Sequence, residues 1–256
     1  MEQAQKLPDF AETFERVLVP AIFDRYARDL VERARPFGPS DRILDLGCGT
    51  GIVARILRER LGGAARLTGL DVNAQMIAKA RSLAPDIEWC EGNAVALPFA
   101  DASFEVVLAQ QVLQFVPDRA AALREIRRVL VPGGRLIAST WRPRMHQPLF
   151  EALGAIAEAH LGTGNDKRWT LDGAELAVLV DGAGFVDGRL DFASLEERYA
   201  AFPIAPSTAA AGYTNISPQV MAAIEAESKA VLARHMAPTG EIANRSVTNV
   251  IVARVP

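Results

Sequence analysis

The stretch ILDLGCGTG, residues Ile43 to Gly51, joins a short apolar run to three closely spaced glycines. The apolar run predicts a buried strand, and the apolar spacing after it predicts a helix from Ile52 to Leu61. Glycines at such a junction let the backbone turn sharply and let a ligand approach the main chain, because there is no Cβ in the way. A strand, a glycine loop and a helix N-terminus in this order are typical of a site for a nucleoside-containing ligand.

The spacing of the glycines separates the candidate ligands. A dinucleotide fingerprint reads G-x-G-x-x-G, whereas this loop reads G-C-G-T-G, with Ile52 where the third glycine belongs. A phosphate loop requires Gly-Lys-Ser or Gly-Lys-Thr after a longer loop, and the sequence has neither. Asp71 ends the next apolar run, where an acid accepts hydrogen bonds from both ribose hydroxyls. The pattern favours an adenosine with an amino-acid tail and no pyrophosphate.

Short apolar runs alternate with helical patterns along most of the chain. This alternation is typical of a parallel sheet with helices on both faces. Asn73 and Asp118 are placed to cap two helices, and Ser217 with Pro218 predicts the start of a third. Strands are predicted at 42–46, 67–71, 87–90, 104–108, 135–140, 185–192 and 247–255, and further helices at 10–35, 150–161, 172–183 and 217–235.

Composition limits the possible functions. The chain has 256 residues, half of them hydrophobic, which suits one α/β domain. Its net charge of −3 argues against a nucleic-acid partner. No apolar run approaches the roughly 20 residues that span a bilayer, and the N-terminus does not read as a secretory signal. Cys48 and Cys90 are too few for a disulfide framework, and no spacing suggests a metal site. We therefore expect a cytoplasmic protein.

Four ordered motifs resemble those of class I S-adenosylmethionine-dependent methyltransferases, of the small-molecule type similar to ubiquinone/menaquinone-biosynthesis methyltransferases. They are ILDLGCGTG, LTGLDVNAQMIAKAR, EGNAVALPFADASFEVVLAQQVLQFVPD and LREIRRVLVPGGRLIAST, and they cover roughly residues 40–141, with a weaker similarity around LDGAELAVLVDGAGF. The resemblance implies a Rossmann-like, seven-stranded, mostly parallel sheet of order 3-2-1-4-5-7-6, with 247–255 as the antiparallel strand. It also implies S-adenosyl-L-methionine as the cofactor, with S-adenosyl-L-homocysteine as its product.

The resemblance assigns roles to the first two motifs. Asp45 and the backbone of Gly47, Cys48 and Gly49 would line the methionine part of the cofactor, and Asp71 would hold the ribose.

The later motifs would contact the rest of the cofactor. Position 93 departs from the family, which usually has Asp there, but an amide oxygen still accepts a hydrogen bond from the adenine amino group. The assigned residues are Val72 and Met76 on the two faces of the adenine, Asn93 and Ala94 at its amino group, the backbone carbonyl of Gln110 at the methionine ammonium, and Gln111 near the methyl group.

Three functions stay open. The first is a methyltransferase acting on an O, C or N atom of a small, apolar or aromatic molecule. The second is a non-catalytic S-adenosylmethionine-binding regulatory or scaffold module, and the third is a nicotinamide oxidoreductase. The catalytic residues stay unassigned: His146 is a candidate base near the substrate side, while His160 and His235 read as structural. Cys48 reads as a packing residue. The alternative interpretation of Gln111 and Gln114 is that their side chains simply face solvent.

The expected organisation is one domain. It comprises an N-terminal helical cover (1–40), a cofactor-binding core (41–141), a helical lid-like insertion (197–245) and a closing strand (247–255). The acceptor is expected over the fourth and fifth strands, beneath Phe14, Phe23, Tyr26, the stretch Trp141 to His146 and the insertion. The alternative is that these aromatics only pack the added helices onto the sheet. We expect a monomer or homodimer.

Overall fold

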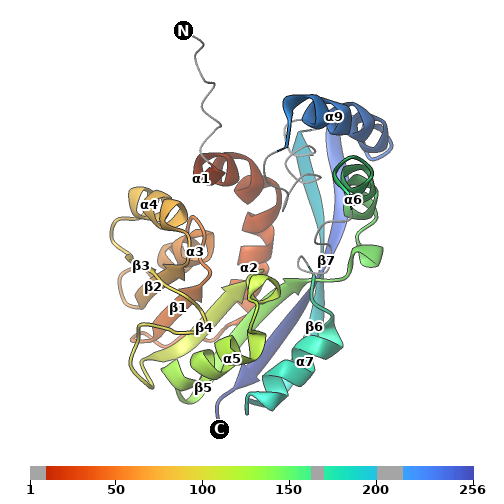
Figure 1. Cartoon of the computed structure of the whole chain (residues 1–256). Coiled ribbons are helices and arrows are strands. Elements are labelled where there is room, and N and C mark those ends of the chain that lie inside the picture. The colour runs from red at the N-terminus through yellow and green to blue at the C-terminus, as the bar shows by residue number, and fades with distance from the viewer. Residues whose placement is uncertain (1–9, 163–169, 201–215) are drawn as a thin grey trace.

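A seven-stranded mixed sheet forms the centre of the computed structural model, which describes residues 10–162, 170–200 and 216–256 (Figure 1). The strand order is β3-β2-β1-β4-β5-β7-β6, as predicted. β7 runs antiparallel to both of its neighbours, and the other neighbouring pairs are parallel. The strands are β1 (Arg42–Leu46), β2 (Arg66–Asp71), β3 (Glu88–Glu91), β4 (Phe104–Gln110), β5 (Leu130–Trp141), β6 (Val186–Ala200) and β7 (Glu241–Arg254).

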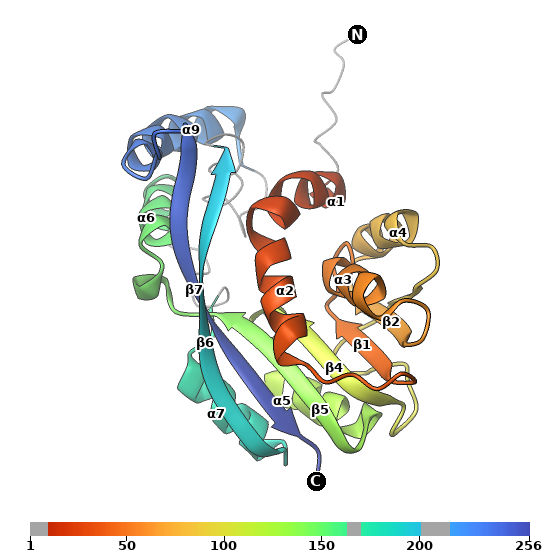
Figure 2. The same cartoon turned by 180° about the vertical axis from the view of Figure 1, so that it is seen from behind.

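Helices cover both faces of this sheet, and a separate apolar core lies on each face. Figure 2 shows α2, α3 and α4 in front of the strands, with α5 and α7 behind them. The predicted caps are confirmed: Asn73 accepts from the N–H groups of Gln75 and Met76, and Asp118 accepts from that of Ala121. These helices are α2 (Asp24–Arg33), α3 (Ile52–Leu61), α4 (Ala74–Leu83), α5 (Arg119–Val129), α7 (Gly173–Gly182), and, farther along the sheet, α6 (Pro148–Leu161) and α9 (Pro218–Ala233).

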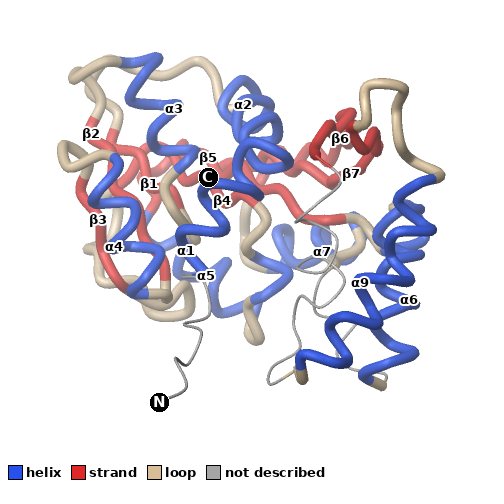
Figure 3. Tube along the Cα trace, turned by 90° about the horizontal axis from the view of Figure 1, so that it is seen from above, coloured by secondary structure: helices blue, strands red, loops and turns tan. Residues whose placement is uncertain are grey.

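The N-terminal helix predicted at 10–35 is present, but its geometry changes along its length. A short α1 (Phe10–Thr13) leads into a π-helical segment, η1 (Phe14–Phe23), which continues into α2. Pro20 lies inside η1 and has no N–H to donate to a regular helix ladder. From above, this helix stands between α3 and α4 on one side and α6 and α9 on the other (Figure 3).

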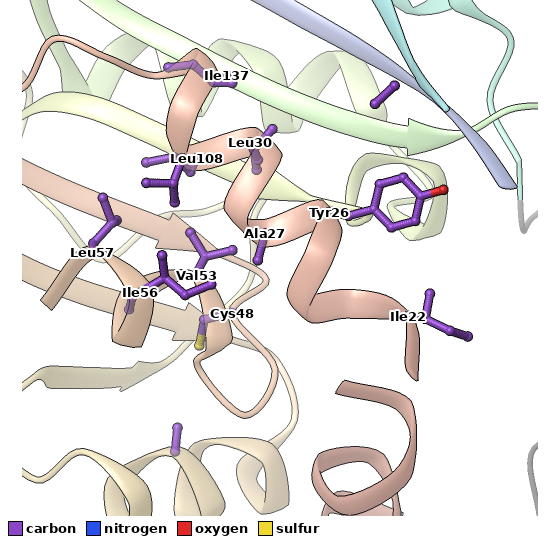
Figure 4. Close-up of a cluster of buried hydrophobic side chains, with 14 of the residues drawn as sticks. Ile22, Tyr26, Ala27, Leu30, Cys48, Val53, Ile56, Leu57, Leu108 and Ile137 are labelled. Carbon is purple, nitrogen blue, oxygen red and sulfur yellow. The ribbon is translucent and has the colours of Figure 1, made fainter. Parts of the chain in front are cut away.

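The C-terminal half of this helix, α2, packs into the apolar core on the face of the sheet that α2, α3 and α4 cover. Ala27 and Leu30 are buried on α2, and Figure 4 shows them directed toward Val53 and Leu57 of α3 and toward Leu108 of β4. Burying aliphatic side chains of this size stabilises the folded state by roughly 1.5–3 kcal/mol each. The helix is therefore anchored at its C-terminal end, while its N-terminal end extends over the carboxyl ends of β1 and β4.

Three strand boundaries predicted from the sequence are wrong by five residues or more. β5 begins at Leu130 rather than 135, β6 runs to Ala200 rather than 192, and β7 begins at Glu241 rather than 247. The predicted insertion from 197 to 245 therefore contributes strand at both of its ends, and its described helical part is α9, with Ser217 as the predicted cap. The pattern is misleading because polar residues occupy buried positions of β7: Asn244, Ser246 and Thr248 lie inside where a strand pattern expects apolar side chains. Residues 201–215 of the expected lid lie outside the described residues.

A close packing contact behind the glycine loop gives a first prediction. A Cβ on Gly51 would lie 2.2 Å from Cη2 of Trp89, and the φ of Gly51 is +87°. We expect Gly51→Ala to lower the free energy of unfolding by about 3 kcal/mol, because left-handed strain and overpacking add. Gly240→Ala is the control, since Gly240 has φ +81°, close to the +87° of Gly51, and none of the described residues has an atom within 4 Å of its Cβ position. Equal shifts of the urea midpoint in the two variants would show that Trp89 does not fill this space.

Candidate functional site

The site lies where the chain changes direction across the sheet. β1 pairs with β2 on one side and with β4 on the other, and consecutive connections run to opposite sides of this point. Ligands of open α/β sheets collect outside the carboxyl ends of the strands at such a switch point. The glycine loop between β1 and α3 lies at this edge (Figure 1).

The N–H groups of the glycine loop are mostly used inside the protein. Cys48 N donates to Leu70 O at 3.0 Å, and Gly51 N donates to Cys48 O at 2.8 Å. Gly49 N donates to Oδ2 of Asp71 at 2.8 Å. An anion-binding loop needs free N–H groups that converge on the ligand. These bonds therefore disfavour a pyrophosphate here, and the loop's part is to shape the site and hold Asp71.

Among the three loop glycines, Gly49 is the one whose Cβ position stays open. A Cβ on Gly47 would overlap the side chain of Val112, and one on Gly51 would overlap Trp89. Among the described residues, the atom nearest to a Cβ on Gly49 would be Cε1 of Phe14, at 3.7 Å, on the N-terminal helix. The space above Gly49 is therefore bounded by that helix rather than by the core.

Asp71 is fixed in place with acceptor positions to spare. Its Oδ2 accepts from Gly49 N and its Oδ1 accepts from Asn73 N, both at 2.8 Å. Asn73 caps α4 itself, so Asp71 is not needed for that task. A carboxylate has about four lone-pair sites, and one remains on each oxygen. The half-buried group can therefore accept two hydroxyls of a ribose.

Asp45 places a second carboxyl group under the loop. It is 2% exposed, and its Oδ2 accepts from Ala54 N at 3.0 Å. Burial raises the pKa of Asp45 to about 7; the Ala54 N–H opposes this rise and the charge of Asp71 adds to it. The charge of Asp71, joined by that of Asp45 once Asp45 loses its proton, attracts a cationic ligand and repels a pyrophosphate.

The raised pKa of Asp45 predicts a pH-dependent stability. The folded protein keeps a proton that the unfolded chain releases above its ordinary pKa of 3.8. The stabilisation is full below that pH and is lost as the pH rises through about 7. Asp45→Asn keeps an acceptor for Ala54, so its stability relative to wild type should rise by on the order of 4 kcal/mol across this range. Urea unfolding at several pH values measures the difference, and parallel curves would contradict it.

The residues assigned to the adenine lie on neighbouring loops. Val72 follows β2 and Asn93 follows β3, and these strands pair in parallel with Asp71 opposite Glu91. Val72 is 70% exposed and Met76 is 6% exposed, so Val72 presents an open apolar face and Met76 a covered one. Oδ1 of Asn93 accepts from Val95 N at 3.1 Å, which fixes the loop that carries Ala94.

Three glutamines at and after the end of β4 have side chains directed into the protein: Gln110, Gln111 and Gln114. Nε2 of Gln110 donates to Phe23 O of the N-terminal helix at 2.9 Å. Gln111 is 4% exposed and Gln114 is 1% exposed, so the solvent-facing interpretation is wrong for both. The reason is the short helix η2 (Leu113–Phe115), whose carbonyls at Leu113 and Gln114 are held by the guanidinium of Arg119.

One ring nitrogen of His146 is hydrogen-bonded to a neighbouring side chain. A guanidinium always donates, so the 3.1 Å contact from Nη2 of Arg142 makes Nε2 of His146 an acceptor and leaves the proton on Nδ1. The single lone pair of Nε2 is used by this hydrogen bond, so in this arrangement Nε2 cannot take a proton from the methyl acceptor. His160 lies 2.8 Å from Glu227 and links α6 to α9, as its structural reading predicts.

Cys48 and His235 match their structural readings. Burial raises the pKa of the Cys48 thiol well above its ordinary value, which disfavours the nucleophilic thiolate. His235 follows the C-terminal end of α9, where its N–H donates to Leu232 O.

Two ion pairs hold the N-terminal helix over the site. Glu15 pairs with Arg55 of α3 at 2.7 Å, and Glu12 pairs with Lys79 of α4 at 2.6 Å. The sequence gives no signal for them, because opposite charges far apart in a chain do not reveal their partners.

Tyr26 has a packing role. Its hydroxyl donates to Ser246 O at 2.8 Å, and its ring meets Trp141 edge-on at 5.2 Å. The alternative interpretation therefore holds for Tyr26: it packs the helix onto the sheet.

Within residues 10–162, 170–200 and 216–256, no group of three or more His, Cys, Asp or Glu side chains is placed to hold a metal ion. In the same ranges, no helix has both the length and the apolar character needed to cross a membrane.

Comparisons with known proteins find methyltransferases. A family model described as "Methyltransferase domain" matches residues 44–138. The demethylmenaquinone methyltransferase of Mycolicibacterium vanbaalenii is 33% identical over 181 residues, which cover 65% of this chain and 77% of that protein. The 2-phytyl-1,4-naphtoquinone methyltransferase of Thermosynechococcus vestitus is 46% identical over 95 residues, or 36% of this chain, and the match spans only 42% of that protein.

A solved structure with the same fold is the phosphoethanolamine N-methyltransferase 2 of Haemonchus contortus in complex with S-adenosyl-L-methionine. It superimposes with a TM-score of 0.61 and 16% sequence identity, over 98% of this chain and 61% of that one. At this identity the likeness shows the fold.

Proposed function

We propose that this chain, which belongs to the class I S-adenosylmethionine-dependent methyltransferases, transfers a methyl group to a small, flat acceptor of the quinone type. The observation that carries the proposal is the pair of carboxyl groups at the glycine loop. Asp71 offers two acceptor positions, and Asp45 adds a carboxyl group that a bound cation would ionise, beside a loop whose N–H groups are largely committed internally. This suits a ribose joined to a cationic amino-acid tail.

The residues present fit this cofactor. Gly49 leaves space for the methionine part beneath Phe14, and Asp71 would hold the ribose hydroxyls. Val72 and Met76 would flank the adenine, with Asn93 and Ala94 at its edge. A bound cation would also lower the pKa of Asp45 and favour its charged form.

S-adenosyl-L-methionine, when bound, supplies an activated methyl group on a sulfonium. The protein's task is then to align the acceptor atom with the methyl group and to exclude water. We assign catalysis to alignment rather than to proton transfer by His146, because Arg142 already occupies Nε2 of that histidine. The backbone of Gln110 and the side chain of Gln111 would adjoin the methionine end.

The acceptor class rests on the relatives and on apolar groups near the loop. Two relatives carry demethylmenaquinone or phytyl-naphtoquinone in their names. Phe14 lies above Gly49, and its ring centroid is 4.9 Å from that of Phe23. Flat apolar rings of this kind suit an aromatic acceptor. The methylated atom, O, C or N, stays open, and the lid role of the insertion stays a proposal.

The setting of the reaction is also proposed. Two free cysteines favour a reducing cytoplasm, and the net charge of −3 gives no basis for nucleic-acid binding. A monomer or homodimer acting on a small-molecule acceptor is the expected form.

Calorimetry and a mass-shift screen test the proposal. Titration with S-adenosylhomocysteine should show binding, whereas titration with NAD should show none. Incubation with S-adenosylmethionine and pools of phenolic, quinonoid and amine compounds should then add 14 Da to a quinonoid or phenolic member, about the mass that replacing H by CH₃ adds. Tight NAD binding without S-adenosylhomocysteine binding would overturn the cofactor assignment. Binding of S-adenosylhomocysteine without methylation of any compound in the pools would overturn the methyl-transfer proposal and favour the non-catalytic binding module.

A further inference from the structure

Two buried amide groups beside the glycine loop are only half satisfied. Nε2 of Gln114 donates to Oε1 of Gln111 at 3.3 Å. The other end of each amide, Nε2 of Gln111 and Oε1 of Gln114, is buried and has no hydrogen-bond partner among residues 10–162, 170–200 and 216–256. Buried polar groups in folded proteins are nearly always paired, so an unpaired couple requires an explanation.

The free ends form a complementary set whichever way the amides are oriented. One hydrogen bond between two amides uses one oxygen and one NH₂ group, which leaves one NH₂ and one oxygen on adjacent groups. Exchanging O and N in both side chains gives the same remainder. A hydroxyl accepts one hydrogen bond and donates another, so a single O–H satisfies both ends. A carbonyl or ether oxygen only accepts and leaves the amide oxygen unpaired.

The place of the pair ties it to the reaction site. Gln111 follows β4 directly, with its N–H bonded to Ser139 O at the end of β5. Its φ of +55° lies in the left-handed region, which is strained for a residue with a side chain and which clusters at functional sites. The next residue, Val112, covers Gly47 of the glycine loop. The pair therefore lies between the cofactor loop and the ends of β4 and β5.

A satisfied glutamine in the same structure shows the contrast. Gln147 is also buried, but its Nε2 donates to Val247 O at 2.7 Å and its Oε1 accepts from Val247 N at 3.3 Å. Gln147 thus reads as a structural clamp on β7. Gln111 and Gln114 have no equivalent strand partner for their free ends.

We propose that Gln111 and Gln114 bind a hydroxyl group of the methyl acceptor, with Nε2 of Gln111 donating a hydrogen bond to its oxygen and Oε1 of Gln114 accepting a hydrogen bond from its O–H. This inference rests on the proposed methyl-transfer function and gives it a specificity: an acceptor ring bearing a free hydroxyl. An acceptor whose oxygen is capped or present only as a carbonyl loses one of the two bonds.

Binding of two naphthalene probes tests the pair without requiring turnover. Wild-type protein saturated with S-adenosylhomocysteine should bind 1-naphthol at least about tenfold more tightly than 1-methoxynaphthalene, since one or two hydrogen bonds correspond to this factor. Gln114→Met has similar length and no polar end, and it should erase the preference while retaining S-adenosylhomocysteine affinity within about twofold. Gln147→Met is the matched control: it should lower the melting temperature and keep the preference for 1-naphthol.

The outcomes separate the two proposals. Equal affinity of wild type for both probes, no binding of either, or a preference that survives in Gln114→Met would overturn the hydroxyl assignment alone. Failure of wild type to bind S-adenosylhomocysteine would instead overturn the proposed function. Should Gln114→Met misfold, the double variant Gln111→Met/Gln114→Met removes both amides together, and a preference for 1-naphthol in that variant counts against the pair.

Discussion

Gly49→Val is expected to abolish S-adenosylhomocysteine binding, with an affinity loss of at least about 100-fold, or roughly 2.7 kcal/mol. The Cβ would stand 3.7 Å from Phe14 in the space assigned to the methionine part of the cofactor, and the two methyl groups would fill it. Isothermal titration calorimetry measures the loss. Because the core leaves this position free, the variant should keep the circular dichroism spectrum of the wild type.

Gly240→Val separates the steric effect from backbone strain. Gly240 also has a positive φ, +81°, and none of the described residues has an atom within 4 Å of its Cβ position. Both variants should lose similar stability, and only Gly49→Val should lose the cofactor. Retained binding in folded Gly49→Val would mean that the glycine loop is not the cofactor site.

Asp71→Ala should weaken S-adenosylhomocysteine binding by at least about tenfold, because each charge-assisted hydrogen bond to a ribose hydroxyl contributes roughly 1.5–3 kcal/mol. Part of any loss of affinity would come from a change in the glycine loop itself, since Asp71 also accepts hydrogen bonds from the N–H groups of Gly49 and Asn73. Asp71→Asn distinguishes the two roles: it keeps acceptor oxygen for one of these bonds but removes the charge, and it should fall between wild type and Asp71→Ala.

Asp172→Ala is the control for losing a carboxylate that accepts a backbone N–H. Asp172 caps α7 by accepting from Ala174 N at 2.8 Å, on the far face of the sheet. It should lower stability by about 1 kcal/mol and leave cofactor affinity unchanged. Wild-type affinity in folded Asp71→Ala would place the ribose elsewhere.

The elements that could be predicted are those whose signals are local. β1, the glycine loop and α3 lie within twenty consecutive residues, and the cap at Asn73 is visible in its own sequence, so their bounds agree with the structure. The sheet order came from the resemblance of four motifs, because strand neighbours cannot be read from periodicity alone.

The elements that could not be predicted depend on distant partners. The first half of β7 buries polar side chains such as Asn244 and Ser246, which look like a loop until their neighbours in the fold are known. The inward turn of Gln114 depends on Arg119, and the ion pair of Glu15 depends on Arg55, forty residues away. The apolar spacing in η1 is close to that of an α-helix, so the sequence pattern does not distinguish its π-helical geometry from an α-helix.

The long reach of the N-terminal helix has a consequence for synthesis of the chain. Tyr26 bonds to Ser246, 220 residues later, and Arg33 pairs with Asp191, 158 residues later. A ribosome adding about 5–20 residues per second needs on the order of ten seconds or more between these partners. Throughout that interval the helix that covers the glycine loop lacks its final contacts with β6 and β7. This helix is made long before its partners and is thus among the last elements to reach its native packing, so its apolar face must stay protected from aggregation until β7 arrives.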